Sequence, residues 1–289
     1  MFSLISCQHK QEKESRQNKE LIIFHAGSLS IPFMQLEKEF EKLHPEINVV
    51  REAAGSVACA RKITDLKRDC DLMASADYKV IEDFLIPVYV DTAIRFATNE
   101  MVICYQENSM EVKRLSVDNW FDILLQKDVR FGRSDPNSDP CGYRTMLMLQ
   151  LAGKYYNQPG LMEKFRQKDA RYMRPKETDL IALLQTDNLD YVFIYKSIAQ
   201  QMNLAFLSLP DSINLGNPAL SEHYRTASFG INGKVPGEKI IQYGEVIIYG
   251  IATLKNPPNP ENAKLFLDFL FSETGQSIIE KNGQRFLSH

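Results

Sequence analysis

Short apolar runs alternate with helical patterns along the first part of the chain, and this order limits the available folds more than any other feature. Runs at residues 21–24, 47–50 and 71–75 predict buried strands. Between them the sequence predicts helices over 32–43 and 57–67, the first from apolar residues that recur every three or four positions. Strands and helices in this alternating order are typical of a parallel sheet with right-handed crossovers. The sequence therefore predicts an α/β fold.

Strand and helix patterns return in the later part of the chain. Strands are predicted at residues 101–105, 190–195 and 245–253, and helices at 118–125, 143–156, 178–184, 261–270 and 275–281. Because the pattern breaks near residue 100 and resumes after about residue 210, we expect two lobes. The first lobe would comprise residues 21–99 and 211–289, and the second residues 100–210, with residues 1–20 before them. Ligands of such folds bind at the carboxyl ends of strands, often between domains.

The composition is that of a globular chain with nearly balanced charge. The 289 residues include 34 Lys+Arg and 37 Asp+Glu, so the net charge is −3, which argues against a nucleic-acid binder. Hydrophobic residues make up 44% and charged residues 25%, which excludes a disordered chain. No stretch approaches the roughly 20 apolar residues of a membrane span. The five cysteines include no C-x-x-C pair, so the sequence gives no support to a zinc or thioredoxin-like site.

The amino-terminal segment has features of a lipid attachment site. The run Leu4-Ile5-Ser6-Cys7 resembles a lipobox, where bacterial lipoproteins are cleaved and lipidated on cysteine, and the polar residues 8–20 predict a solvated tether. Only six residues precede Cys7 and none is basic, whereas a signal peptide has a basic segment and about 7–15 apolar residues. Either the translation start lies upstream or the match is by chance. We expect a lipid on Cys7 and a periplasmic or cell-surface location.

Three turns place small or polar residues directly before a predicted helix. They are Gly27-Ser28, Gly55-Ser56 and Asp139-Pro140-Cys141-Gly142. Helix N-termini carry unpaired N–H groups and a partial positive charge, and glycine lets a ligand approach the backbone closely. One serine in such a position indicates only an N-cap. Three such turns together predict a site that binds an oxyanion without contacts from lysine or arginine.

Two carboxylates accompany these turns. Asp139 and Glu177 flank helix starts, where each alone would be interpreted as a capping residue. A carboxylate repels a tetrahedral oxyanion such as sulfate, but its hard oxygen suits a high-valent metal centre that can expand its coordination shell. The pair therefore favours a metal oxyanion over sulfate.

Several segments together resemble one family of binding proteins. They are His25-Ala-Gly-Ser-Leu-Ser30, Gly55-Ser56, residues 99–102, residues 190–197 and Asp135-Pro-Asn-Ser-Asp-Pro-Cys-Gly-Tyr-Arg144. The chain resembles the molybdate/tungstate-binding proteins of ABC importers, in their archaeal-type branch, over nearly everything after residue 20. The resemblance implies a two-lobed periplasmic-binding-protein (type II) fold, each lobe a mainly parallel sheet flanked by helices, with the ligand between the lobes.

The resemblance also implies roles for particular residues. The oxyanion would be bound by Gly27, Ser28, Ser56, Asp139, Pro140, Cys141, Glu177 and Tyr195. Asp139 and Glu177 would bind the molybdenum or tungsten centre directly and complete an approximately octahedral shell, and the Tyr195 hydroxyl would contact the oxyanion. The protein would be a monomer without cofactor or enzymatic activity that delivers molybdate or tungstate to an ABC permease.

Other interpretations of the same residues remain open at this stage. Tyr195 lies in an apolar run and could be an ordinary core aromatic. Cys141 near a helix N-terminus could be the nucleophile of an enzyme, with His25 as the candidate base. A third possibility is an anion-sensing domain that signals to a membrane partner.

Overall fold

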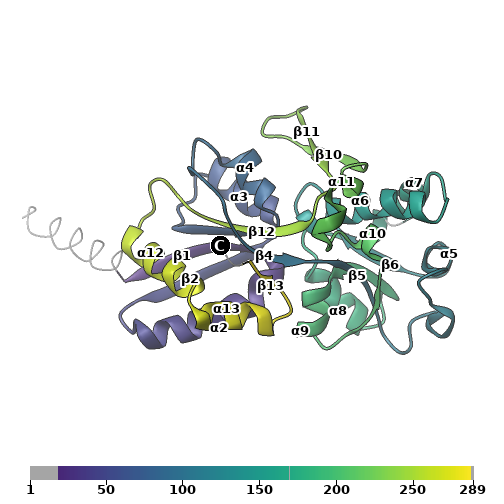
Figure 1. Cartoon of the computed structure of the whole chain (residues 1–289), viewed down its shortest axis with the longest axis horizontal. Helices are drawn as coiled ribbons and strands as arrows, with labels where there is room; N and C mark the ends of the chain where they lie inside the picture. Colours follow the sequence, from purple (N-terminus) through teal and green to yellow (C-terminus); the bar gives the residue numbers. More distant parts are fainter. Residues whose placement is uncertain (1–18, 169, 288–289) are drawn as a thin grey trace, which may run out of the picture.

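The computed structural model describes residues 19–168 and 170–287, which form two lobes, each with a β-sheet between helices (Figure 1). Cys7 and residues 8–18 of the predicted tether lie outside the described residues. In the described part of the chain no helix is long and apolar enough to cross a membrane. The α/β class predicted from the sequence is confirmed.

The sheet of the first lobe is formed from the alternating strands and helices predicted in the first part of the chain. Its strands are β1 (Glu20–Ala26), β2 (Asn48–Ala54), β3 (Leu72–Ser75), β4 (Ile94–Asn99), β12 (Ile247–Thr253) and β13 (Arg285–Phe286), in the order β13-β4-β12-β3-β1-β2. β1 lies parallel to both β2 and β3, with Phe24 opposite Glu52 and Met73. The carboxyl ends of these strands therefore meet at one edge of the sheet.

The helices of the first lobe cover both faces of this sheet. They are α2 (Ser30–Leu43), α3 (Ser56–Thr64), α4 (Tyr78–Phe84), α12 (Pro260–Leu270) and α13 (Glu273–Lys281). α3 and α4 lie on one face, and α2, α12 and α13 on the other (Figure 1). In α2 the predicted apolar face is buried at Phe33, Leu36 and Phe40, whereas Leu43 is exposed. The helix ends before Pro45, which cannot supply a backbone N–H.

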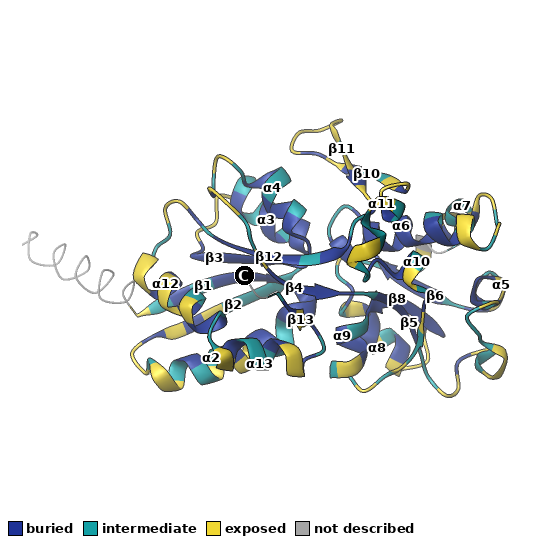
Figure 2. Cartoon of the chain, viewed as in Figure 1, coloured by how far each residue is buried: buried dark blue, intermediate teal, exposed yellow. Residues whose placement is uncertain are grey.

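The second lobe has its own sheet and helices. Its strands are β5 (Met101–Tyr105), β6 (Phe131–Ser134), β7 (Met173–Arg174), β8 (Tyr191–Tyr195) and β9 (Ala205–Ser208), in the order β7-β6-β8-β5-β9. Its helices are α5 (Trp120–Leu124), α6 (Pro140–Tyr155), α7 (Leu161–Lys168), α8 (Asp179–Gln185), α9 (Lys196–Gln201), α10 (Asp211–Asn214) and α11 (Ser221–Tyr224). Short 3₁₀ turns complete the chain at η1 (Gly27–Leu29), η2 (Val112–Arg114), η3 (Ala170–Tyr172) and η4 (Pro218–Leu220). The interior of both sheets is buried (Figure 2).

Both sheets are mixed, whereas mainly parallel sheets were expected. In the first lobe β12 is antiparallel to β3 and β4, and in the second β5 is antiparallel to β8 and β9. β4 and β5 follow each other along the chain and cross from one lobe to the other, and β12 brings the chain back. β12 and β5 each enter their sheet from the other lobe and run against their neighbours, which accounts for the antiparallel pairs that these two strands make.

The segment after residue 210, which was expected to belong to the first lobe, first runs beside the second. α10 and the strand β10 (Ser228–Asn232) both pack against α6 of the second lobe. The chain returns to the first sheet only at β12. There Ile247 pairs with Asn99 of β4, so the two crossings lie side by side.

A hairpin of β10 and β11 (Lys239–Tyr243) contacts both lobes (Figure 1). On the first lobe, Arg61 donates to the carbonyl of Gly233 at 2.8 Å and Gln242 donates to Asp83 at 2.8 Å. On the second lobe, the N–H of Asn232 donates to the side-chain oxygen of Asn137 at 2.9 Å. The lobes are therefore held together in a closed arrangement by contacts outside the crossing strands as well.

The core of the second lobe is an aromatic cluster around Phe165. Its ring lies 5.7 Å from Trp120, 5.0 Å from Phe131 and 5.7 Å from Phe193, measured between centroids. All four side chains are buried. Trp120 is the chain's single tryptophan, so its fluorescence reports on this core.

We expect Phe165→Ala to lower the free energy of unfolding by about 3–5 kcal/mol, because the substitution leaves a cavity among these rings. Urea denaturation followed by the fluorescence of Trp120 measures the loss. Leu43→Ala is the control, since Leu43 is 65% exposed and its loss should stay within about 0.5 kcal/mol. Similar losses for both variants would contradict the assignment of Phe165 to the core.

Candidate oxyanion-binding site

The first predicted turn follows β1 and presents Ser28. The Ser28 hydroxyl accepts a hydrogen bond from the Tyr249 hydroxyl at 2.9 Å, and Tyr249 accepts one from the Asn99 amide at 3.0 Å. Because its lone pair is used in this chain of bonds, the proton of Ser28 is available for another acceptor. Gly27 lies directly against Glu177, since a β-carbon on Gly27 would come within 3.2 Å of a carboxylate oxygen of Glu177.

The second turn lies at the start of α3. The Ser56 hydroxyl accepts a hydrogen bond from the N–H of Ala76 at 3.0 Å, so it too retains a proton to donate. The N–H of Ala58 reaches across to the carbonyl of Ser138 in the second lobe at 3.1 Å. Gly55 makes this approach possible, because a β-carbon there would lie 2.2 Å from the same carbonyl oxygen.

The third turn carries Asp139 at the start of α6. One carboxylate oxygen of Asp139 accepts from the N–H of Cys141 at 3.2 Å, as expected of an N-cap residue. The other accepts from the N–H of Glu177 at 2.9 Å. Asp139 therefore joins the start of α6 to the segment before α8 and fixes the position of Glu177. Pro140 occupies the first turn of α6, where its missing N–H costs nothing.

Glu177 is the unusual member of this group. Its side chain is fully buried, and neither of its carboxylate oxygens has a hydrogen-bond partner among the described residues. The same holds within the described chain for the hydroxyls of Tyr195 and Ser134. Buried polar atoms are nearly always paired, so unpaired atoms in one place point to a ligand.

The structure brings the predicted residues of both lobes to one interface. Asp139 and Gly27 both contact Glu177, Tyr195 packs against Tyr249 with ring centroids 6.1 Å apart, and Gly55 meets the turn that precedes Asp139. The predicted polar side chains have exposed fractions of 0–1%: Ser28, Ser56, Asp139, Glu177 and Tyr195. The interpretation of Tyr195 as a core aromatic accounts for its ring but not for its unpaired hydroxyl.

Burial changes the protonation of these groups. It raises the pKa of Asp139, and burial together with the Asp139 charge raises the pKa of Glu177 well above its ordinary value. Burial also raises the pKa of the Tyr195 hydroxyl, which therefore stays protonated and can donate to an anion. The site thus combines hydroxyl donors with two acidic groups that are costly to ionise without a partner.

Three further residues support the site, although the sequence analysis gave them no role in binding: Asn99, Ser197 and Tyr249. Tyr249 and Asn99 hold Ser28, and the Asn99 amide also donates to the Ser197 hydroxyl at 2.7 Å. Tyr249 lies in an apolar strand, and no local pattern marks its hydroxyl.

The geometry around Cys141 disfavours the cysteine-enzyme interpretation. The thiol is fully buried, donates to the carbonyl of Phe193 at 3.8 Å, and burial followed by the Asp139 and Glu177 charges raises its pKa well above the ordinary value. The His25 ring instead bonds the carbonyl of Ala26 at 2.8 Å. Burial lowers the pKa of His25 to about 4, so it stays neutral. A thiolate at Cys141 is therefore not favoured.

Comparison with known families agrees with this geometry. The family described as bacterial extracellular solute-binding protein matches residues 21–285. The chain belongs to this family. A solute-binding protein of this kind closes two lobes on its ligand, and the buried interface described above has the same arrangement.

The names of two relatives of this solute-binding protein state a ligand. The molybdate/tungstate-binding protein WtpA of Pyrococcus abyssi is 42% identical over 100% of this chain and 91% of its own length. WtpA of Thermococcus kodakarensis is 41% identical over 98% and 87%. An uncharacterized solute-binding protein of Petrotoga mobilis is 48% identical over 92% of this chain and 83% of its own.

Solved structures confirm the two-lobed periplasmic-binding-protein (type II) fold. The periplasmic molybdate-binding protein of Azotobacter vinelandii matches with a TM-score of 0.64 at 17% identity, over 93% of this chain and 99% of that one. The sulfate-binding protein SubI of Mycobacterium tuberculosis matches with 0.67 at 13% identity, over 93% and 88%. At these identities the likeness concerns the fold, which is shared by binders of different anions.

We expect Gly55→Ala to prevent full closure of the lobes while leaving each lobe folded. The backbone of Gly55 has φ −59°, which alanine adopts readily, but its β-carbon would collide with the carbonyl of Ser138. Small-angle scattering should show a larger radius of gyration than for the wild type, with an unchanged circular dichroism spectrum. A radius equal to that of the wild type would show that the contact yields without opening the lobes.

We expect Glu177→Gln to stabilise the ligand-free protein at about pH 8 and to lose this advantage towards about pH 4. The pKa of Glu177 is raised in the folded wild type, so the unfolded chain releases this proton first as pH rises. The free energy of unfolding of the wild type therefore falls above the ordinary glutamate pKa of about 4.3, whereas glutamine has no proton to release. Melting temperatures across this pH range measure the effect. Glu280→Gln is the control at an exposed position, and a difference from wild type that does not depend on pH would contradict the argument.

Proposed function

We propose that this solute-binding protein captures molybdate or tungstate between its lobes and delivers it to an ABC permease. The observation that carries the proposal is the fully buried carboxylate of Glu177, whose oxygens have no partner among the described side chains and main-chain groups, beside the buried carboxylate of Asp139. The WtpA relatives, whose names give this ligand, support the same assignment.

The oxygens of the anion would be bound by neutral donors. Ser28 and Ser56 each accept one hydrogen bond from the protein and keep a proton to donate, and Tyr195 keeps its proton because burial raises its pKa. The backbone of Gly27 and the Pro140–Cys141 turn would add the positive ends of helix starts. This arrangement needs no lysine or arginine in contact with the anion.

The metal centre would be bound by Asp139 and Glu177. Sulfur and phosphorus in tetrahedral anions accept no further ligands, so two buried carboxylates would only repel sulfate or phosphate. Molybdenum and tungsten take additional hard oxygen ligands, and one oxygen from each carboxylate would give an approximately octahedral centre. The two acidic groups would thus exclude sulfate and phosphate and retain molybdate or tungstate.

The family also bears on the cellular setting. The chain belongs to a family described as extracellular, which supports a location in the periplasm or on the cell surface. We propose that Cys7, outside the described residues, carries the lipid anchor, and that the protein acts as a monomer without enzymatic activity. The anion-sensing alternative uses the same site, and a permease encoded beside this chain would favour transport.

Thermal-shift measurements with tungstate, molybdate, sulfate and phosphate test the proposal. A ligand that binds only the folded state at about 1,000 times its Kd adds about 4 kcal/mol of stability. We expect tungstate and molybdate to raise the melting temperature, and sulfate and phosphate at the same concentration to leave it unchanged. Equal shifts by all four anions would contradict a role of the metal centre.

Variants can distinguish a role of the two carboxylates in anion binding from a role in the stability of the fold. Asp139→Asn combined with Glu177→Gln should abolish the tungstate shift, because both metal ligands lose their charge. Asp71→Asn is the matched control, since Asp71 is also fully buried but bonds Ile22 and Asn259 at the other end of β3. It should lower the melting temperature and keep the tungstate shift. Tungstate binding by the double variant in calorimetry with wild-type affinity would overturn the assignment of the two carboxylates.

A further inference from the structure

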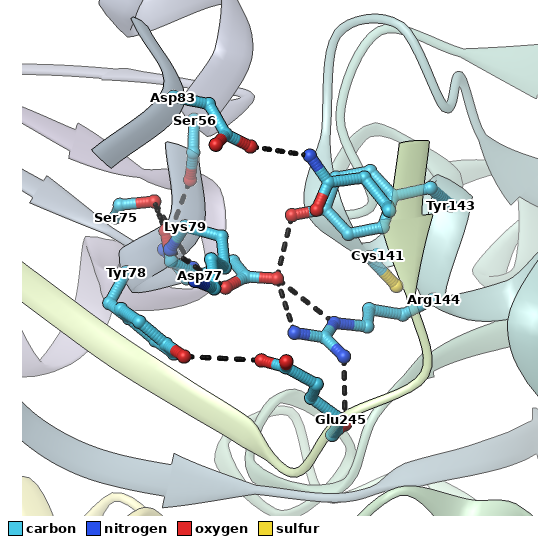
Figure 3. A network of polar contacts seen from close by, with 12 residues as sticks. Ser56, Ser75, Asp77, Tyr78, Lys79, Asp83, Cys141, Tyr143, Arg144 and Glu245 are labelled. Carbon is cyan, nitrogen blue, oxygen red and sulfur yellow. Dashed lines mark hydrogen bonds and ion pairs between the residues drawn. The ribbon is translucent and has the colours of Figure 1, made fainter. Parts of the chain in front are cut away.

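A buried ion pair joins the two lobes next to the proposed site (Figure 3). Asp77 lies at the start of α4 in the first lobe, and Arg144 lies in α6 of the second. One carboxylate oxygen of Asp77 accepts hydrogen bonds from the Tyr143 hydroxyl at 2.7 Å and from Arg144 Nε at 3.0 Å, and Arg144 Nη2 bonds the same oxygen. The remaining nitrogen of Arg144 donates to the carbonyl of Glu245 at 2.7 Å, in the segment that leads back to the first lobe.

This pair is buried where the two lobes meet. The side chains of Asp77 and Arg144 have exposed fractions of 0% and 2%, although they belong to different lobes. Burial opposes the charge on Arg144, yet the neighbouring Asp77 carboxylate raises the pKa of the guanidinium, so Arg144 keeps its positive charge. An exposed ion pair contributes little, whereas a buried charge that loses its partner is strongly destabilising. The interaction therefore forms fully in the closed arrangement and contributes little when the lobes separate.

Each half of the pair is fixed within its own lobe. The other oxygen of Asp77 accepts from the N–H of Lys79 at 3.1 Å, and the backbone N–H of Asp77 donates to the Ser75 hydroxyl at 3.1 Å. Tyr143 and Arg144 lie in the first turns of α6. The two halves therefore meet as rigid groups, and their geometry depends on the relative position of the lobes.

Both halves are also connected to the proposed oxyanion site. The residue before Asp77, Ala76, donates its N–H to the Ser56 hydroxyl at 3.0 Å. On the other side, Tyr143 lies two residues after Cys141 in the helix that Asp139 caps. An anion that draws Ser56 and the start of α6 together would draw Asp77 and Arg144 together as well.

We propose that Asp77, Tyr143 and Arg144 form an interlobe latch that sets the population of the closed state and so positions Ser56 and the start of α6 for the anion. The latch residues are positioning residues and do not touch the ligand. The apparent affinity of a protein that binds in one of two states falls with the population of that state. The choice of tungstate as probe rests on the proposed function, but the latch itself does not.

The test compares Tyr143→Phe with Tyr191→Phe. Both remove one buried tyrosine hydroxyl, but the Tyr191 hydroxyl donates to the carbonyl of Met110 within the second lobe at 2.6 Å. We expect similar losses of melting temperature for the two variants. Tyr143→Phe should weaken tungstate binding about tenfold, mainly through faster dissociation in stopped-flow measurements, and should bind no sulfate, as expected of the wild type. Tyr191→Phe should bind as the wild type does.

The outcomes distinguish a role of Tyr143 in the latch from direct contact of Tyr143 with the anion. Equal dissociation rates for the two variants would overturn the latch, and so would binding of sulfate by Tyr143→Phe, which would indicate that the Tyr143 hydroxyl contacts the anion directly. If the wild type binds no tungstate, the proposed function fails and small-angle scattering decides the latch alone. A larger radius of gyration for Tyr143→Phe than for Tyr191→Phe would then support it, and equal radii would contradict it.

Discussion

The burial of two carboxylates side by side between the lobes is the interaction on which the rest of this structure depends. Asp139 is satisfied by backbone N–H groups, but Glu177 is left without a hydrogen bond from any described residue. Such a group costs free energy unless it is protonated or meets a partner of opposite character. The fold therefore places between the lobes an acidic group that is costly to ionise, and the hydroxyl donors and helix starts around it can bind a ligand that pairs with this group.

Much of the fold could be predicted from local patterns. The parallel half of the first sheet and helices α2 and α12 have regular apolar spacing. Each begins within two residues of its predicted start, although β2 ends four residues beyond its predicted range. β4 could not be predicted, because its sequence Ile94–Asn99 mixes apolar residues with Arg95, Thr98 and Asn99. Its strand geometry comes from pairing with β12, about 150 residues later, and long-range pairing leaves no signal in a local window.

The candidate site likewise has some residues that local sequence predicts and others that it does not. The three turns could be predicted because glycine, serine and N-cap residues before a helix have a local physical meaning. Glu177 was placed by resemblance, and its contact with Asp139 depends on how β6, β7 and α8 pack. Asp77 would be interpreted from the sequence as a helix cap only, which it also is. Its ion pair with Arg144 spans 67 positions and two lobes, so only the folded chain reveals it.

The pairing of the two crossings limits how the lobes can move. Asn99 and Ile247 lie opposite each other in the sheet, and the N–H of Ile247 bonds the carbonyl of Leu215 in the second lobe at 2.9 Å. A rotation of one lobe against the other must therefore be taken up at the end of β4 and the start of β12, because the hinge of a domain closure consists of a few residues at element ends.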